Sequence, residues 1–121
     1  NHLGQLAVTD LLVDPELSKR ADTDRAGLVE LLRTRVEAFN SAASTAGLHV
    51  PRYDGGFFVV VFTPDGEKTA AVMRDMGVYV IPLKGAVRVA LCATPEAEIP
   101  RLVEALRAGI DQAEAGQGSS A

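Results

Sequence analysis

The sequence predicts an α+β fold, with helices packed on a small sheet. Apolar residues recur at helical spacing in four segments, and three short runs rich in β-branched and aromatic residues lie between the later helices. This order of elements builds a layer of helices on a sheet around one core. With 121 residues the chain has the size of one domain, which we assign to residues 1–115, followed by a small, polar and flexible tail at 116–121.

Two helices are predicted in the N-terminal third. Residues 2–13 carry leucines at helical spacing and end before Pro15, which disfavours helix in the residue ahead of it. Residues 15–46 continue the helical pattern and stop at Gly47. The first half of this long helix is much more polar than the second, so it either is interrupted near residues 22–24 or bridges another surface. Its expected apolar stripe is Leu28, Leu31, Leu32, Val36 and Phe39.

A strand and a helix follow. Residues 57–62, FFVVVF, lack polar alternation, which predicts a central strand covered on both faces. Residues 63–66, TPDG, have turn chemistry, and residues 66–76 are expected to form a helix that Gly77 stops.

The C-terminal third is predicted to hold two strands and a capped helix. The strands are residues 78–81 and 86–92. Thr94 is expected to cap the last helix, with Pro95 at its first position. The buried side of this helix is predicted to be Ile99, Leu102, Val103, Leu106 and Ile110.

Charge and composition exclude several classes of function. A net charge of -4 without a basic stripe argues against binding to nucleic acid or to an anionic membrane surface. No run approaches the length of a membrane-spanning helix, and no signal-peptide pattern opens the chain. The single cysteine, Cys92, cannot form an intramolecular disulfide; we expect a core residue in a buried strand and a cytoplasmic location.

Arg88 is the leading site candidate because it interrupts the apolar run 87–91. An ionised guanidinium is costly to bury unless a carboxylate or phosphate meets it. The alternative is a strand arginine whose side chain simply reaches water. No catalytic or metal-binding residue is predicted: His2 and His49 lack partners at motif spacing, and Lys84 lies in a turn without an apolar pocket.

Several motifs together resemble one family. An aromatic strand opens with Gly55-Gly56-Phe57, a helix ends in Gly77-Val78, and a strand containing V-R-V-A-L-C-A leads into Thr94. The opening NHLGQLAVTDLLVDPEL is similar to the segment that leads into the helix joining the two domains of that family. Residues 1–113 thus resemble the C-terminal small domain of class I and II, fold type I, pyridoxal-phosphate-dependent aminotransferases of the aspartate and aromatic amino-acid type.

The resemblance implies a parent enzyme that transfers an amino group from an amino acid to a 2-oxo acid with pyridoxal phosphate. It implies that Arg88 binds the substrate's α-carboxylate in a bidentate salt bridge, and that Phe57 lines the side-chain pocket. The large domain, with its Schiff-base lysine and most cofactor contacts, is missing from this chain. We therefore expect this part alone to be inactive, not to bind the cofactor, and to form a homodimer or larger species through bare apolar surface.

Two other functions remain open. One is a stand-alone regulatory module of ferredoxin-like type that binds an amino acid, and the other is a noncatalytic interaction domain. The long helix at residues 15–46 argues against the first, because a compact sensor does not need it.

Overall fold

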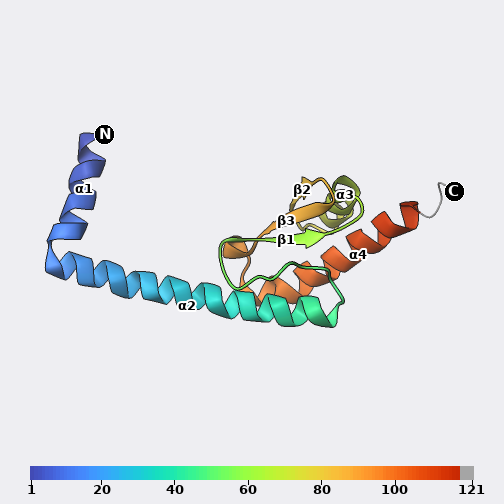
Figure 1. The fold of residues 1–121 in the computed structure, drawn as a ribbon, viewed down its shortest axis with the longest axis horizontal. Helices are drawn as coiled ribbons and strands as arrows, with labels where there is room; N and C mark the ends of the chain where they lie inside the picture. The colour runs from blue at the N-terminus through green and yellow to red at the C-terminus, as the bar shows by residue number, and fades with distance from the viewer. Residues whose placement is uncertain (118–121) are drawn as a thin grey trace. The chain divides into compact units, whose positions relative to one another are not determined.

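The computed structural model of the protein describes residues 1–117 (Figure 1). The chain divides into two compact units, Asn1–Leu31 and Leu32–Ala121. The single-domain assignment of residues 1–115 stays a prediction. Within the described residues, no helix is both long and apolar enough to cross a membrane.

The N-terminal unit contains α1 (His2–Val13) and the first half of α2 (Pro15–Thr45). Asp14 separates the two helices: its side-chain Oδ1 accepts hydrogen bonds from the backbone N–H groups of Glu16, at 2.9 Å, and Leu17, at 3.1 Å. These bonds satisfy donors that the first turn of a helix leaves unpaired. Both predicted helices are confirmed, and α2 continues without interruption through residues 22–24.

The apolar stripe predicted along α2 is buried only in its C-terminal part. Val36 and Phe39 are buried, together with Ala43, which the prediction omitted. Leu28 and Leu31 are instead 62% and 44% exposed. Helical spacing alone identifies an apolar face, but that face becomes buried only where other elements pack against it.

The second unit is built on a three-stranded antiparallel sheet of order β1-β3-β2. The strands are β1 (Phe58–Phe62), β2 (Ile81–Leu83) and β3 (Ala86–Ala90). Because β3 pairs antiparallel with both neighbours, β1 and β2 run parallel and α3 (Gly66–Asp75) connects them, which is a split βαβ arrangement. The α+β fold is thereby confirmed.

The prediction that residues 57–62 form a central strand covered on both faces is wrong, because β1 lies at an edge of the sheet. Val59 and Val61 point into the core, whereas Phe58 and Phe62 are exposed on the opposite face. Residues 57–62 are therefore continuously apolar because the exposed face of the sheet is apolar too, and not because both faces are buried.

The other two strands also differ from their predicted bounds. β2 begins at Ile81 and not at residue 78, and it includes Pro82, which an edge strand tolerates because proline cannot donate to a ladder. β3 ends at Ala90, and the turn η1 (Leu91–Ala93) follows. Cys92 lies in that turn and is partly exposed, so its placement in a buried strand was wrong.

The core lies between one face of the sheet and the helices α2, α3 and α4 (Ile99–Gln117). In Figure 1, α4 and the C-terminal half of α2 run along the same side of the sheet. The residues expected on the buried side of the last helix are confirmed as buried: Ile99, Leu102, Val103, Leu106 and Ile110.

The start of the last helix differs from the prediction. Thr94 does not cap it; the Thr94 hydroxyl donates a hydrogen bond to the Ala90 carbonyl at 3.1 Å. Pro95 precedes the short turn η2 (Glu96–Glu98), and α4 begins only at Ile99. At its other end α4 includes residues 116 and 117, which we had assigned to the tail, while residues 118–121 lie outside the described part of the chain.

Candidate functional site

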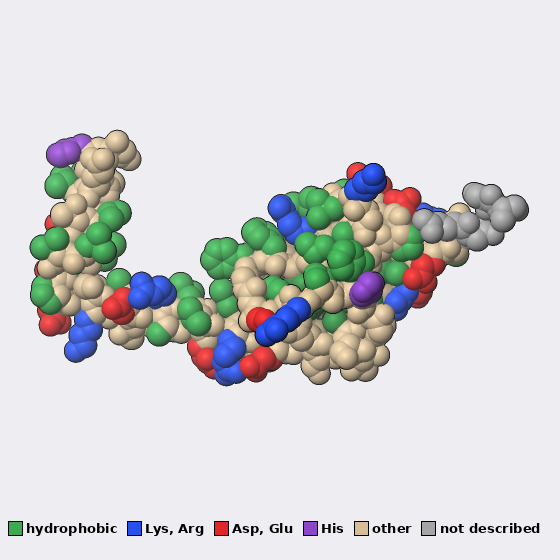
Figure 2. Space-filling model, in the orientation of Figure 1, with side chains coloured by type: hydrophobic (Ala, Val, Ile, Leu, Met, Phe, Trp, Pro, Cys, Tyr) green, Lys and Arg blue, Asp and Glu red, His purple; other side chains and the backbone are tan. Residues whose placement is uncertain are grey.

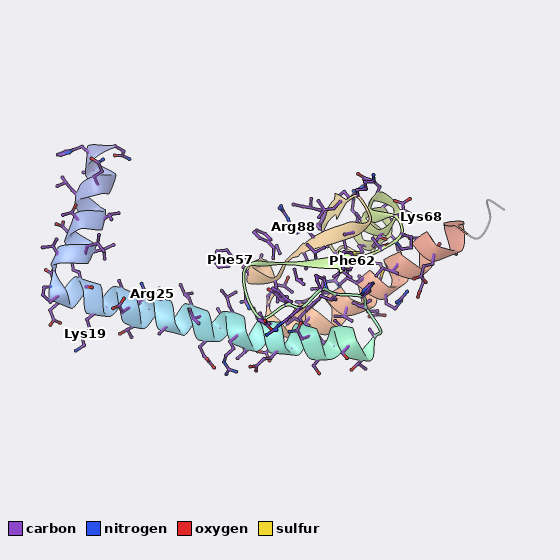
Figure 3. All side chains as sticks on the ribbon, in the orientation of Figure 1. Lys19, Arg25, Phe57, Phe62, Lys68 and Arg88 are labelled. Carbon is purple, nitrogen blue, oxygen red and sulfur yellow. The ribbon has the colours of Figure 1, made fainter. Side chains whose placement is uncertain are left out.

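Arg88 lies in the middle of the central strand β3. Alternation along the strand sends Val87 and Val89 into the core and Arg88 to the opposite face. Arg88 is directly opposite Val60 of β1 and Ile81 of β2. The long side chain is half-buried and projects from the sheet (Figure 3). The guanidinium is therefore held in the centre of the sheet face opposite the core of the second unit.

The charge of Arg88 has no carboxylate partner among residues 1–117. Its Nε atom is buried and makes no hydrogen bond. The guanidinium carbon instead lies 4.8 Å from the centre of the Phe58 ring. A half-buried cation without an anion has the electrostatic properties of a site prepared for a carboxylate or phosphate.

The surroundings of Arg88 on the open face are apolar. Hydrophobic side chains gather over the sheet in Figure 2. The large exposed ones from its three strands are Phe58, Phe62, Ile81 and Leu83. Apolar neighbours lower the local dielectric, which strengthens an ion pair formed there relative to one in bulk water.

The two site residues expected from the sequence, Arg88 and Phe57, are not brought into ring contact. Phe57 precedes β1 by one residue, is 60% exposed, and its backbone carbonyl accepts a hydrogen bond from the Cys92 N–H at 3.1 Å. The aromatic ring against the guanidinium is that of Phe58. Sequence reasoning missed Phe58, although the two-residue period of a strand paired with β3 would have placed it on the Arg88 face.

A second arginine organises the turn that follows β3. The Nη1 group of Arg35, in α2, donates to the Cys92 carbonyl at 2.5 Å, and the Arg35 Nε is buried without a partner. The Tyr53 hydroxyl donates to the Gly56 carbonyl at 2.8 Å, and burial, followed by an electrostatic effect of Cys92, raises the pKa of Tyr53. These contacts hold η1 and the approach to β1 in place.

The residues of this chain do not fit a self-contained site for pyridoxal phosphate. The cofactor needs an amine for its imine and a cradle for its phosphate. Lys84 is exposed in the β2–β3 turn, Lys68 lies partly exposed on α3, and Lys19 belongs to the N-terminal unit. Within the described residues, no group of histidine, cysteine or acidic side chains could hold a metal ion. We therefore derive no chemistry through a bound cofactor.

Comparisons with known proteins agree on one family. The sequence model of the family described as aminotransferase class I and II matches residues 1–106. A search of curated proteins found no match.

Solved structures give the same result. An aminotransferase from Anaerococcus prevotii superposes with a TM-score of 0.78 at 28% identity, over 83% of this chain and 25% of that one. Aspartate aminotransferase from Thermus thermophilus with maleate gives 0.68 at 27% identity, over 85% and 28%. Kynurenine aminotransferase from Pyrococcus horikoshii gives 0.73 at 20% identity, over 98% and 31%, a likeness of fold alone. The chain thus spans between a quarter and a third of the length of these structures.

Proposed function

This chain belongs to the class I and II aminotransferase family, and from that premise we propose that it is the part of an amino-acid aminotransferase that binds the substrate's α-carboxylate. The whole enzyme would transfer an amino group from an amino acid to a 2-oxo acid. Since the chain spans 25% of the Anaerococcus prevotii enzyme, the site for pyridoxal phosphate would lie mainly in the rest of such an enzyme.

The observation that carries this proposal is the state of Arg88. Its guanidinium is half-buried on an open, apolar sheet face, and no carboxylate of residues 1–117 pairs with it. Amino acids and 2-oxo acids share a carboxylate next to the reacting carbon, so one arginine serves both substrates of a transamination. The planar guanidinium matches the planar carboxylate in two parallel hydrogen bonds.

The comparisons add indirect support. The Thermus thermophilus aspartate aminotransferase was solved with maleate, a dicarboxylate, so a relative of this fold takes a carboxylate ligand. The family match also includes all of α1 and α2, which a compact ferredoxin-like regulatory module does not need. We therefore do not propose the regulatory module as the function.

The proposal is tested by Arg88→Lys in the complete aminotransferase polypeptide that contains this chain. Lysine keeps the charge but loses the second, parallel hydrogen bond. We expect KM to rise about tenfold or more, alike for every amino acid and 2-oxo acid, because hydrogen bonds to charged groups are worth roughly 1.5–3 kcal/mol. A primary amine without a carboxylate should show no change.

The matched control is Arg52→Lys. Arg52 pairs with Asp54 at 2.6 Å, and both side chains are well exposed, so this change alters an arginine of no proposed role. If Arg88→Lys leaves KM as Arg52→Lys does, Arg88 does not bind the substrate and the proposal fails.

A further inference from the structure

The Arg88 guanidinium lies against the ring of Phe58. Binding of a substrate carboxylate by Arg88 does not by itself require this contact. Phe58 pairs with Ala90 across the β1–β3 ladder, so it is the diagonal neighbour of Arg88 on the same face. Its ring centre is 4.8 Å from the guanidinium carbon, within the range of a cation–π contact. The ring therefore supports the charged group from one side, while Val60 and Ile81, directly opposite Arg88 on the flanking strands, are aliphatic.

The burial of the guanidinium is uneven. The Arg88 Nε is buried without a hydrogen-bond partner. Neither Nη atom of Arg88 is among the buried polar atoms that lack a partner. The edge formed by the two Nη groups is therefore the one open to a ligand. A carboxylate that accepts two parallel hydrogen bonds end-on binds at that edge. Such binding is strongest when the plane of the guanidinium is already fixed before the ligand arrives.

Arginine has a flexible side chain, and a half-exposed one samples many rotamers unless a neighbour restricts it. Val60 and Ile81, directly opposite Arg88 on the two flanking strands, limit its sideways motion but offer no flat surface or hydrogen bond. Among the described residues, Phe58 supplies the aromatic surface against the guanidinium. Phe57 has no such contact.

We propose that Phe58 is a positioning residue that orients the Arg88 guanidinium for carboxylate binding, a role that rests on the proposed function of Arg88. Removing the Phe58 ring should leave the Arg88 charge in place and allow the guanidinium plane to rotate. The carboxylate contact exists before and after the chemical step alike, so its loss should raise KM and leave kcat nearly unchanged.

The test compares three variants in the complete aminotransferase polypeptide. Phe58→Leu removes the ring and keeps most of the apolar volume, and Phe58→Tyr keeps the ring. Phe62→Leu is the matched control, because Phe62 also lies in β1 on the Arg88 face but its ring packs against His49, at 5.0 Å between ring centres. We expect Phe58→Leu to raise KM for every amino acid about three- to tenfold, the range that a cation–π contact of this exposure allows. Phe58→Tyr should restore KM to within about twofold, the effect of a small fraction of such a contact.

A second measurement uses the chain of residues 1–121 itself. In nitrogen-15 NMR spectra the Arg88 Nε–H should show a ring-current shift and slow exchange with water, because the atom is buried beside an aromatic ring. Both features should be lost in Phe58→Leu and kept in Phe58→Tyr and Phe62→Leu.

The outcomes separate the two proposals. If Arg88→Lys does not change KM, the proposed function fails whatever Phe58 does. If Arg88→Lys raises KM but Phe58→Leu behaves as Phe62→Leu, in KM and in the Nε–H signal, Arg88 binds the carboxylate without help from Phe58 and the positioning role is refuted. A loss of kcat in Phe58→Leu that Phe58→Tyr does not restore would also refute it, since it would indicate general damage to the fold.

Discussion

Gly66→Ala is expected to destabilise the second unit strongly. Gly66 is the first residue of α3, where the helix meets the turn between β2 and β3. A Cβ added to it would lie 2.2 Å from the Leu83 carbonyl oxygen and 2.3 Å from that of Ala86. Both atoms belong to the backbone of that hairpin, so no side-chain rotation relieves the clash. The helix and the hairpin would have to separate by roughly 1 Å, against a core packed as densely as a crystal.

The size of the effect follows from this geometry. Overpacking a core typically costs about 1–3 kcal/mol, and a clash with two backbone carbonyls belongs at the upper end of that range. For a unit of this length about 3 kcal/mol lowers the melting temperature by more than roughly 10 °C. Ala would favour the helix by up to about 1 kcal/mol over Gly, which is too little to offset the clash.

Thermal and urea denaturation followed by circular dichroism measure the change. The matched control is Gly55→Ala: no heavy atom lies within 4 Å of its added Cβ, and its φ is not among the positive values. We expect Gly55→Ala to stay within about 0.5 kcal/mol of the unchanged chain. If Gly66→Ala unfolds at the same temperature as Gly55→Ala, α3 does not approach the hairpin as described.

Four further predictions concern other parts of the molecule. Thr69→Val should cost about 1–3 kcal/mol in denaturation, because it leaves the buried Thr63 hydroxyl, 2.7 Å from that of Thr69, without its partner; a Thr63→Val and Thr69→Val double variant should recover part of the loss, and no recovery would contradict the pair. In a Tyr79→Phe background, the tyrosinate absorbance of folded Tyr53 should titrate above its ordinary pKa of 10.0, and stability should fall as the pH rises through that raised pKa, because the unfolded chain ionises first; a midpoint at 10.0 would argue against burial. The bare leucines of α1, which include Leu6 and Leu11, should make the chain associate, so light scattering should show a dimer or larger species that Leu6→Glu with Leu11→Glu weakens, whereas a strict monomer at high concentration would contradict this. Arg88→Ala should change the free energy of unfolding by less than about 1 kcal/mol, since Arg88 forms no salt bridge in the described part of the chain, and a loss of several kcal/mol would instead assign Arg88 a structural role.

The parts of the fold that the sequence predicted depend on local chemistry. Pro15 begins α2, and Gly47 and Gly77 end helices with φ values of +65° and +75°, which glycine adopts at low cost. Arg88 was identified because one charge in an apolar run is conspicuous without any knowledge of its neighbours. The buried side of α4 followed from helical spacing in the same way.

The parts that the sequence did not decide depend on which segments meet in space. Residues 57–62 read as a central strand, but pairing with β3 placed them at an edge, and no pattern within six residues specifies strand order. Leu28 and Leu31 continued the apolar spacing of Val36 and Phe39, yet burial depends on what lies opposite each turn of α2.

For the site, the sequence by itself determined the cation and its place in a strand, because residue type and alternation are local properties. Only the tertiary structure decided that the Arg88 face is open, that Phe58 and not Phe57 supplies the ring, and that Gly66 must lack a side chain. Each of these depends on pairing or contact between segments far apart in the chain. These contacts are set by the register of β1 on β3 and by the position of α3 against the β2–β3 hairpin. Both are fixed together when the core packs.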